Sequence, residues 1–497
     1  MISWLRMKRW NWGLWLGLAV FGYLLHFPID TNLPIEAQRM FALAVFMGIL
    51  WMTEAIPVSV TALLPLVMFP LLGIAKTSAI STNYAHHLIF LFLGGFFIAA
   101  AMQKWELHKR FAVNVLYWVG KTPHRLVLAF MLATAFLSMW ISNTATTIMI
   151  LPIGLAVIKR MEGEKLQAGA FGSVLMLGIA YSASIGGTGT LIGTPPNLVF
   201  SAVYKKFFPQ LPEVGFTEWM LYIIPLTVLL FVITYFYLTR LFLTRRVLED
   251  LTMDRQVVIK EKRSLGKMTT PELRVLILFT VTAVLWIFRS DIQIGNFVLP
   301  GWPHWVGLGG QIQDSTIAIG MAILLFILPA GVDDPEKVTL LHWKDILTIP
   351  WDILLLFGGG LALADGIQRT GLSEYFAQQF SFIIHLPPVV FITLITLSVA
   401  FLTEFTSNTA VATTVLPILA AVAQQFQMSP LIIMLPATIA ASCAFMLPVA
   451  TPPNAIVFSS RYISIKQMVK IGVGLIFIAS VVNGLYFTLL VNIIVPK

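Results

Sequence analysis

The chain has 497 residues, of which 58% are hydrophobic and only 11% are charged, and it carries a formal net charge of +9. With a mean hydropathy of +0.86, this composition excludes an ordinary soluble domain and predicts an all-α polytopic membrane protein. The single cysteine, Cys443, excludes intrachain disulfides and cysteine-based metal sites.

Eleven apolar stretches approach the length of about 20 residues that a helix needs to cross a bilayer. They lie near residues 12–27, 37–52, 57–72, 87–102, 170–200, 220–243, 272–288, 315–330, 351–367, 429–459 and 468–495. The fifth and the tenth are broken by proline and glycine. We therefore predict about 11 transmembrane helices.

Two segments repeat one pattern, AFLSMWISNTATTIMILPI at Ala135–Ile153 and AFLTEFTSNTAVATTVLPI at Ala400–Ile418. A second matched pair follows them, GTPPN at Gly193–Asn197 and ATPPN at Ala450–Asn454. Helix-breaking and polar residues at matching places in two hydrophobic halves are the best sequence indication of a transport site in a membrane protein.

Each Ser-Asn-Thr triplet interrupts an apolar segment that lies between two predicted crossings. The arms on either side are roughly fifteen residues long, too short for about 30 Å of hydrocarbon at 1.5 Å per residue. We predict two re-entrant helical hairpins, residues 124–160 and 387–427. Non-helical backbone at their tips is tolerated at membrane depth only inside protein or beside a wet cavity.

Lysine and arginine cluster before the first crossing, after the fourth and after the sixth, with Lys205 and Lys206 as exceptions. By the positive-inside rule the N-terminus is cytoplasmic and the C-terminus external. Five crossings in each copy make the repeat inverted, so the first hairpin enters from the cytoplasm and the second from outside. The predicted divisions are an N-terminal span (1–36), repeat 1 (37–243), a basic cytoplasmic linker (244–270) and repeat 2 (271–497).

The basic linker carries interspersed acidic residues and lacks stacking aromatic residues, which favours contact with membrane lipid over a nucleic-acid partner. Glu404 takes the place of Met139 in the second copy. A carboxylate inside a membrane is a functional candidate, although a structural partner such as backbone amides is the expectation for Glu404.

The triplets can supply neutral oxygen ligands. Ser138 and Ser142, like Thr403 and Ser407, are four residues apart and share one helical face directed at the tip. Unwound carbonyls with Ser, Thr and Asn side chains suit a dehydrated sodium ion, and helix N-termini suit a carboxylate. One isolated triplet could simply bond to its own helix, but the duplication favours the binding interpretation.

On these four linked motifs the chain resembles the divalent anion/sodium symporter (DASS) family, whose animal members include sodium-coupled dicarboxylate and citrate carriers. The resemblance covers nearly the whole chain. It implies a homodimer in which a mobile transport domain crosses the membrane beside a scaffold by an elevator mechanism. That transport domain would comprise both hairpins and the broken helices 170–203 and 429–459.

The resemblance also implies site residues, carried over by motif. The sodium ligands would be Ser138, Ser142, Asn143 and Gly193 in one site, and Thr403, Thr406, Asn408 and Ala450 in the other. The substrate carboxylates would lie against Ser142, Asn143, Thr144, Thr194, Pro195, Ser407, Asn408, Thr409, Thr451 and Pro452.

We expect a sodium-coupled symporter of small dicarboxylate anions with four carbons (succinate, fumarate and malate) in the plasma membrane, or the inner membrane of a bacterium. Sodium is co-transported and no organic cofactor is expected. The alternatives are a sodium-independent dicarboxylate or citrate exchanger, a sodium-coupled sulfate carrier and, more remotely, a channel. An enzyme would need a nucleophile with a base, or a metal-ligand set, and the duplicated motifs hold neither.

Similar sodium-independent exchangers tend to place a basic side chain near the tips. The corresponding residues near the tips of this chain are Thr146, Thr147, Val411 and Ala412. None of them is basic, which favours sodium coupling.

Overall fold

The computed structural model describes residues 11–27, 29–30, 33–162, 170–243, 256–294, 297–332, 338–379 and 386–494. The described part is mostly helical and includes one antiparallel hairpin of β1 (Ile292–Ile294) and β2 (Phe297–Leu299). The first ten residues and positions 244–255 of the predicted basic linker lie outside the described residues. Much of the charge pattern that predicts the topology is therefore not placed.

Within the described residues, seven helical segments are long and apolar enough to cross a membrane. They are α3 (Ile35–Thr53), the run of α6 (Thr77–Ser81), η1 (Thr82–Ala85) and α7 (His87–Lys104), then α10 (Asn143–Glu162), α11 (Ala170–Gly187), α13 (Phe216–Phe242), α16 (Thr270–Ile287) and α25 (Ile465–Ile494). The chain is a multi-pass membrane protein. The predicted number of 11 crossings stays a prediction.

Shorter helices occupy the remaining apolar stretches. They are α2 (Trp12–His26), α4 (Val58–Thr61), α5 (Leu64–Leu71), α9 (Pro123–Ser138), α18 (Asp314–Ile327), α21 (Pro388–Thr403) and α23 (Pro430–Ala441). The helix α19 (Trp351–Arg369) fills the stretch predicted near 351–367. Exposed apolar side chains such as Leu229 and Phe236 on α13 provide surface suited to lipid.

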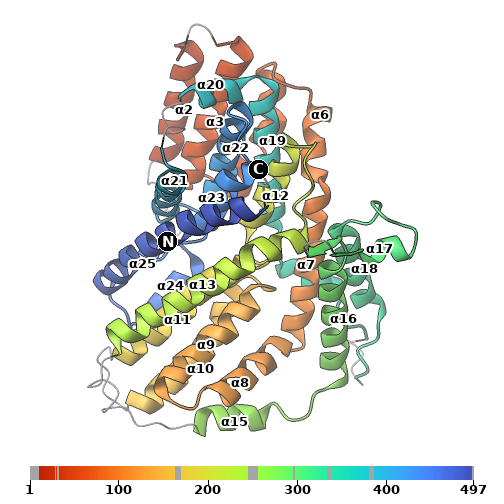
Figure 1. Cartoon of the computed structure of the whole chain (residues 1–497), viewed down its shortest axis with the longest axis vertical. Coiled ribbons are helices and arrows are strands. Elements are labelled where there is room, and N and C mark those ends of the chain that lie inside the picture. Colours follow the sequence, from red (N-terminus) through yellow and green to blue (C-terminus); the bar gives the residue numbers. More distant parts are fainter. Residues whose placement is uncertain are drawn as a thin grey trace, which may run out of the picture.

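The duplication is visible in the order of elements. The run α7, α8 (Leu107–Val119), α9, α10, α11, α12 (Pro195–Phe207) and α13 is matched by α19, α20 (Leu372–Gln379), α21, α22 (Asn408–Gln425), α23, α24 (Pro452–Ser459) and α25. Figure 1 shows α8, α9, α10, α11 and α13 running diagonally at one end of the molecule, with α3, α19 and α22 at the other.

A matched pair of glycines lets helices approach closely in both halves. A Cβ at Gly94 of α7 would lie 2.6 Å from the backbone of Ala318 in α18, and one at Gly359 of α19 would lie 2.6 Å from Cα of Ala62 beside α4. Since no real Cβ fits at such distances, both contacts require glycine. The repeat is thus preserved in the packing of helices as well as in the sequence.

Both Ser-Asn-Thr segments form helix–turn–helix pairs, α9 with α10 and α21 with α22. The first arms, α9 and α21, have 16 residues each, close to the expected fifteen. The expected length is wrong for the second arms, because α10 has 20 residues and α22 has 18. Pro152 and Pro417 lie inside these helices without ending them. Length alone therefore does not make the hairpins re-entrant.

Both broken helices are interrupted at the proline motifs. The first unwinds between α11 and α12, and the second between α23 and α24. Thr194 and Thr451 are extended N-cap residues, each followed by two prolines in the first turn of the next helix. Proline lacks the N–H that an N-terminal turn would leave unpaired, so each helix restarts there. Two stretches of irregular backbone are thereby held inside the protein.

Candidate functional site

Both hairpin tips and both helix breaks line one cavity of about 790 Å³. From the first repeat it is lined by Ser142, Asn143, Thr144, Gly193, Thr194 and Pro195. From the second repeat it is lined by Thr406, Ser407, Asn408, Thr409, Ala450, Thr451 and Pro452. All ten residues predicted to contact substrate are among them. The structure thus brings two motifs far apart in the sequence around a single space.

The remaining two predicted sodium ligands, Ser138 and Thr403, do not line the cavity and are fully buried behind its wall. Ser138 Oγ donates a hydrogen bond of 2.6 Å to Asn143 Oδ1, and Thr403 Oγ1 donates one of 2.6 Å to Asn408 Oδ1. Each tip therefore has a hydroxyl and an amide oxygen in contact. These are neutral oxygen ligands of the kind that suits an alkali cation.

Each tip asparagine is also the first residue of its helix, α10 or α22. The first turn of each helix lies beside the cavity, and its N–H groups carry the positive end of the helix dipole. Such a helix end favours a carboxylate oxygen. Two helix N-termini at one cavity match the two ends of a dicarboxylate.

The asparagines of the two proline motifs hold the broken helices, a role that the sequence analysis did not assign. Asn197 Nδ2 donates to the carbonyl oxygens of Gly187 and Thr190 at 3.0 and 2.7 Å. Asn454 Nδ2 donates to those of Ala444 and Leu447 at 3.1 and 3.0 Å. The repetition of Asn three residues after each Thr was the available sequence signal.

The end of α3, the start of α4 and the start of α19 also line the cavity, as do Phe405, Val449, Pro453 and Ala455 of the second repeat. Glu54, the left-handed C-cap of α3, and Asp352 are the two charged residues there. Among the described residues that line the cavity there is no lysine or arginine. A bound dianion would thus need its charge compensated by helix ends and by other bound ions.

The described residues contain no group of three or more His, Cys, Asp or Glu that could hold a metal ion. Within that part of the chain, the oxygens at the tips are the candidates for cation ligands. Because these oxygens carry no fixed charge, they suit a monovalent ion better than a strongly charged divalent one.

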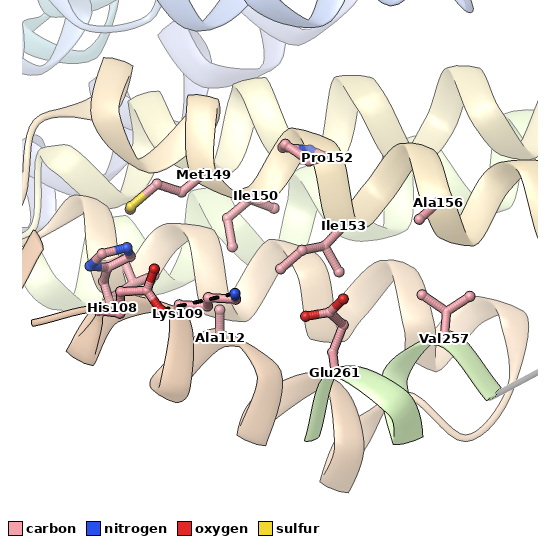
Figure 2. Close-up of a pocket in the computed structure, with 12 residues that line it drawn as sticks. His108, Lys109, Ala112, Met149, Ile150, Pro152, Ile153, Ala156, Val257 and Glu261 are labelled. Atoms are coloured by element: carbon pink, nitrogen blue, oxygen red, sulfur yellow. Dashed lines mark ion pairs between the residues drawn. The ribbon is translucent and has the colours of Figure 1, made fainter. Parts of the chain in front are cut away.

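A second cavity, of about 350 Å³, lies between α8, α10 and α15 (Gln256–Ser264) (Figure 2). Its wall is mostly apolar, with Ile150 and Ile153 of α10 facing α8 and α15. The ion pair of Glu106 with Lys109 at 4.0 Å and the Glu261 side chain lie at its edge. No residue of the candidate site lines this second cavity, so the two are separate.

Comparison with known proteins gives a family match over residues 8–493, to the model described as the sodium:sulfate symporter transmembrane region. A protein of Staphylococcus saprophyticus named sodium-dependent dicarboxylate transporter SdcS is 40% identical over 485 residues, which cover 96% of this chain and 90% of that protein. The SdcS of Staphylococcus aureus strain RF122 is 40% identical over 492 residues, covering 97% and 91%.

Two solved structures share the fold at 14% sequence identity. The YdaH transporter of Alcanivorax borkumensis matches with a TM-score of 0.55 over 82% of this chain and 87% of that one. MtrF of Neisseria gonorrhoeae, described among antimetabolite efflux pumps, matches with a TM-score of 0.56 over 94% and 96%. Both neighbours are transport proteins, and at this identity they indicate the fold alone.

Proposed function

The chain belongs to the sodium:sulfate symporter family, also called the divalent anion/sodium symporters, and on this premise we propose that it couples sodium entry to uptake of four-carbon dicarboxylates. Succinate, fumarate and malate are the proposed substrates. Relatives that are 40% identical are named sodium-dependent dicarboxylate transporters, which makes a carrier rather than an enzyme the class of this protein.

One observation supports the proposal most directly: two matched tips, with neutral oxygens and helix N-termini, line a cavity that has no described lysine or arginine. Sodium ions at Asn143 and Asn408 would supply the positive charge that the dianion needs. Ion and substrate should therefore bind cooperatively.

The membrane potential is a second physical reason for sodium coupling. Moving a dianion inward against 100 mV, inside negative, costs about 4.6 kcal/mol. Two sodium ions cancel this charge, and a third adds about 2.3 kcal/mol of driving force from the potential. The repeat accounts for two cation sites, so a ratio above two would require an additional site.

We further propose a homodimer with an elevator mechanism, an N-terminus in the cytoplasm and an external C-terminus. In this topology the two hairpins are re-entrant and move with the broken helices. The end of α3, the start of α4 and the start of α19, which line the cavity, lie on the cytoplasmic side. The described conformation then corresponds to an inward-facing state.

An ion pair joins the C-terminal end of α12 to the C-terminal end of α19, away from the cavity. Lys206 Nζ lies 2.8 Å from a carboxylate oxygen of the buried Asp365 and donates to Asn83 Oδ1 at 2.8 Å. Arg369 pairs with the other Asp365 oxygen at 2.7 Å. In the proposed mechanism α12 moves and α19 stays, so this contact exists only in the inward-facing state.

Cross-linking this contact is expected to stop transport. Lys206→Cys with Asp365→Cys, joined by a short bis-methanethiosulfonate, should reduce uptake into proteoliposomes to below about a tenth. A reducing agent should restore uptake, and the single variants should respond to the reagent little. The native Cys443 is buried and adds little background. Full uptake in the cross-linked double variant would contradict the proposed movement of α12 past α19.

Uptake of labelled succinate into proteoliposomes tests the function itself. An inward sodium gradient should drive accumulation, whereas potassium or choline in its place should reduce it by at least about tenfold. Uptake that ignores sodium and requires internal dicarboxylate would identify an exchanger instead. Competition by unlabelled sulfate or citrate stronger than that by fumarate and malate would reassign the substrate.

A further inference from the structure

Glu404 is a fully buried carboxylate at the end of α21, beside the second hairpin tip. Its two oxygens accept hydrogen bonds from the backbone N–H groups of Phe445, Met446 and Leu447 at 2.6, 2.7 and 2.9 Å. These three residues lie in the unwound segment between α23 and α24. One side chain of the hairpin thus binds three consecutive amides of the broken helix.

The carbonyl side of the same segment is also held. Asn454 Nδ2 donates to the carbonyls of Ala444 and Leu447, and the Tyr181 hydroxyl donates to that of Phe445 at 2.8 Å. In the two peptide groups that join Ala444 to Phe445 and Phe445 to Met446, both the C=O and the N–H are therefore hydrogen-bonded. Each of these bonds polarises the peptide group and strengthens the other. Leu447, the last of these bonded residues, lies three positions before Ala450, a proposed sodium ligand in the same segment.

The first repeat has no equivalent of this carboxylate. Met139 stands in the place of Glu404, and there the contact is a hydrogen bond from the Thr190 hydroxyl to the Met139 carbonyl. Among the described residues, Glu404 forms no ion pair with a lysine, arginine or histidine. The two halves of the site therefore differ by one buried negative charge that lacks a described basic partner.

We propose that Glu404 is a positioning residue that fixes the unwound backbone at the second sodium site, and that its charge makes this site bind sodium more tightly than the first. The inference rests on the proposed function, because it concerns the proposed sodium ligands Thr403, Asn408 and Ala450. Thr403 adjoins Glu404 in the chain and also donates to the Ala441 carbonyl at 3.0 Å. Sodium then fills the second site first.

Glu404→Gln tests the charge while keeping the shape of the side chain. The purified protein is melted over a sodium chloride series, with choline chloride holding ionic strength constant and without substrate. The sodium concentration for half-maximal stabilisation should rise about tenfold or more, since removal of the charge weakens the hydrogen bonds that fix the backbone at this site. A matched control, Glu374→Gln on the exposed side of α20, should leave it unchanged.

A purely structural role for Glu404 predicts a different result. It would lower the melting temperature equally at every sodium concentration and leave the half-maximal concentration within about threefold of the wild type. That result would overturn the inference.

A second comparison does not depend on whether Glu404→Gln folds. Ser138→Ala and Thr403→Ala remove matched hydroxyls from the two proposed sites, and each variant is compared with its own melting temperature without sodium. The loss of Thr403 should raise the half-maximal sodium concentration several-fold more than the loss of Ser138. Equal shifts, or a larger shift for Ser138→Ala, would overturn the inference.

The wild type separates this inference from the proposed function. If sodium neither stabilises the wild type nor drives its uptake, the proposed function fails and the inference with it. If the wild type depends on sodium and Glu404→Gln retains the same sodium dependence, only the role of Glu404 is wrong.

Discussion

Replacing Asn143 or Asn408 with alanine is expected to reduce sodium-dependent uptake by at least about 100-fold, because each asparagine contributes both to a proposed cation site and to the wall that holds the substrate. Each Oδ1 accepts the hydroxyl proton of Ser138 or Thr403. Loss of Asn143 leaves the buried Ser138 hydroxyl without this acceptor at a cost of about 1–3 kcal/mol, whereas Thr403 keeps its hydrogen bond to the Ala441 carbonyl. Either variant removes one of the few oxygen ligands proposed for the ion.

The first tip has little room to compensate. A Cβ at Gly187 would lie 2.5 Å from Asn143 Oδ1, so the asparagine is in close contact with the first broken helix. Alanine would leave a polar void there rather than a repacked wall. Adding sodium should not restore uptake, because the variant removes a proposed ligand completely instead of weakening its contact with the ion.

Initial rates in proteoliposomes, at sodium concentrations up to saturation, measure this effect. The variants should elute from size-exclusion chromatography as the wild type does, which separates loss of the site from loss of the fold. Gln424→Ala, at an exposed position of α22, is the control and should transport normally. Normal uptake in both tip variants would refute the assignment of the site.

The duplicated motifs were accessible from sequence because polar residues in strongly apolar segments are conspicuous, and a repeat at a fixed offset is hard to produce by chance. Most of the residues found in this way line one cavity, and Ser138 and Thr403 lie buried behind its wall. Whether they bind sodium and dicarboxylate is a prediction that the geometry favours. The lengths of α10 and α22 could not be predicted from the sequence, because proline tends to end a helix in water but is tolerated inside a helix that packs among other membrane helices.

Contacts between distant residues were also beyond the sequence. Lys206 was an exception to the charge pattern that predicts the topology, and the structure pairs it with Asp365, 159 positions away. The sequence analysis expected backbone amides as partners of Glu404 but could not name the residues. Their identity depends on where the second broken helix unwinds.

The asparagines of the proline motifs give the second large prediction. Asn197→Ala or Asn454→Ala is expected to lower the maximal rate of sodium-dependent uptake at least about 30-fold. Each variant removes two side-chain hydrogen bonds to the broken helix. The Gly187 or Ala444 carbonyl then loses its partner at a cost of about 1–3 kcal/mol, whereas the Thr190 and Leu447 carbonyls still accept the backbone N–H groups of Gly193 and Ala450. The unwound backbone would then relax, and the positions of Gly193 and Ala450, which line the cavity, would no longer be fixed.

Aspartate at the same two positions separates geometry from volume. Asn197→Asp and Asn454→Asp keep the size of the side chain but replace its donor with an acceptor facing carbonyl oxygens, so they should be as damaging as alanine. Asn483→Ala, a change at an equally buried asparagine on α25, is the matched control and should retain most of the uptake. If the aspartate variants transported like the wild type, the hydrogen bonds to the broken helices would not be what holds the site, because the same space would be filled without them.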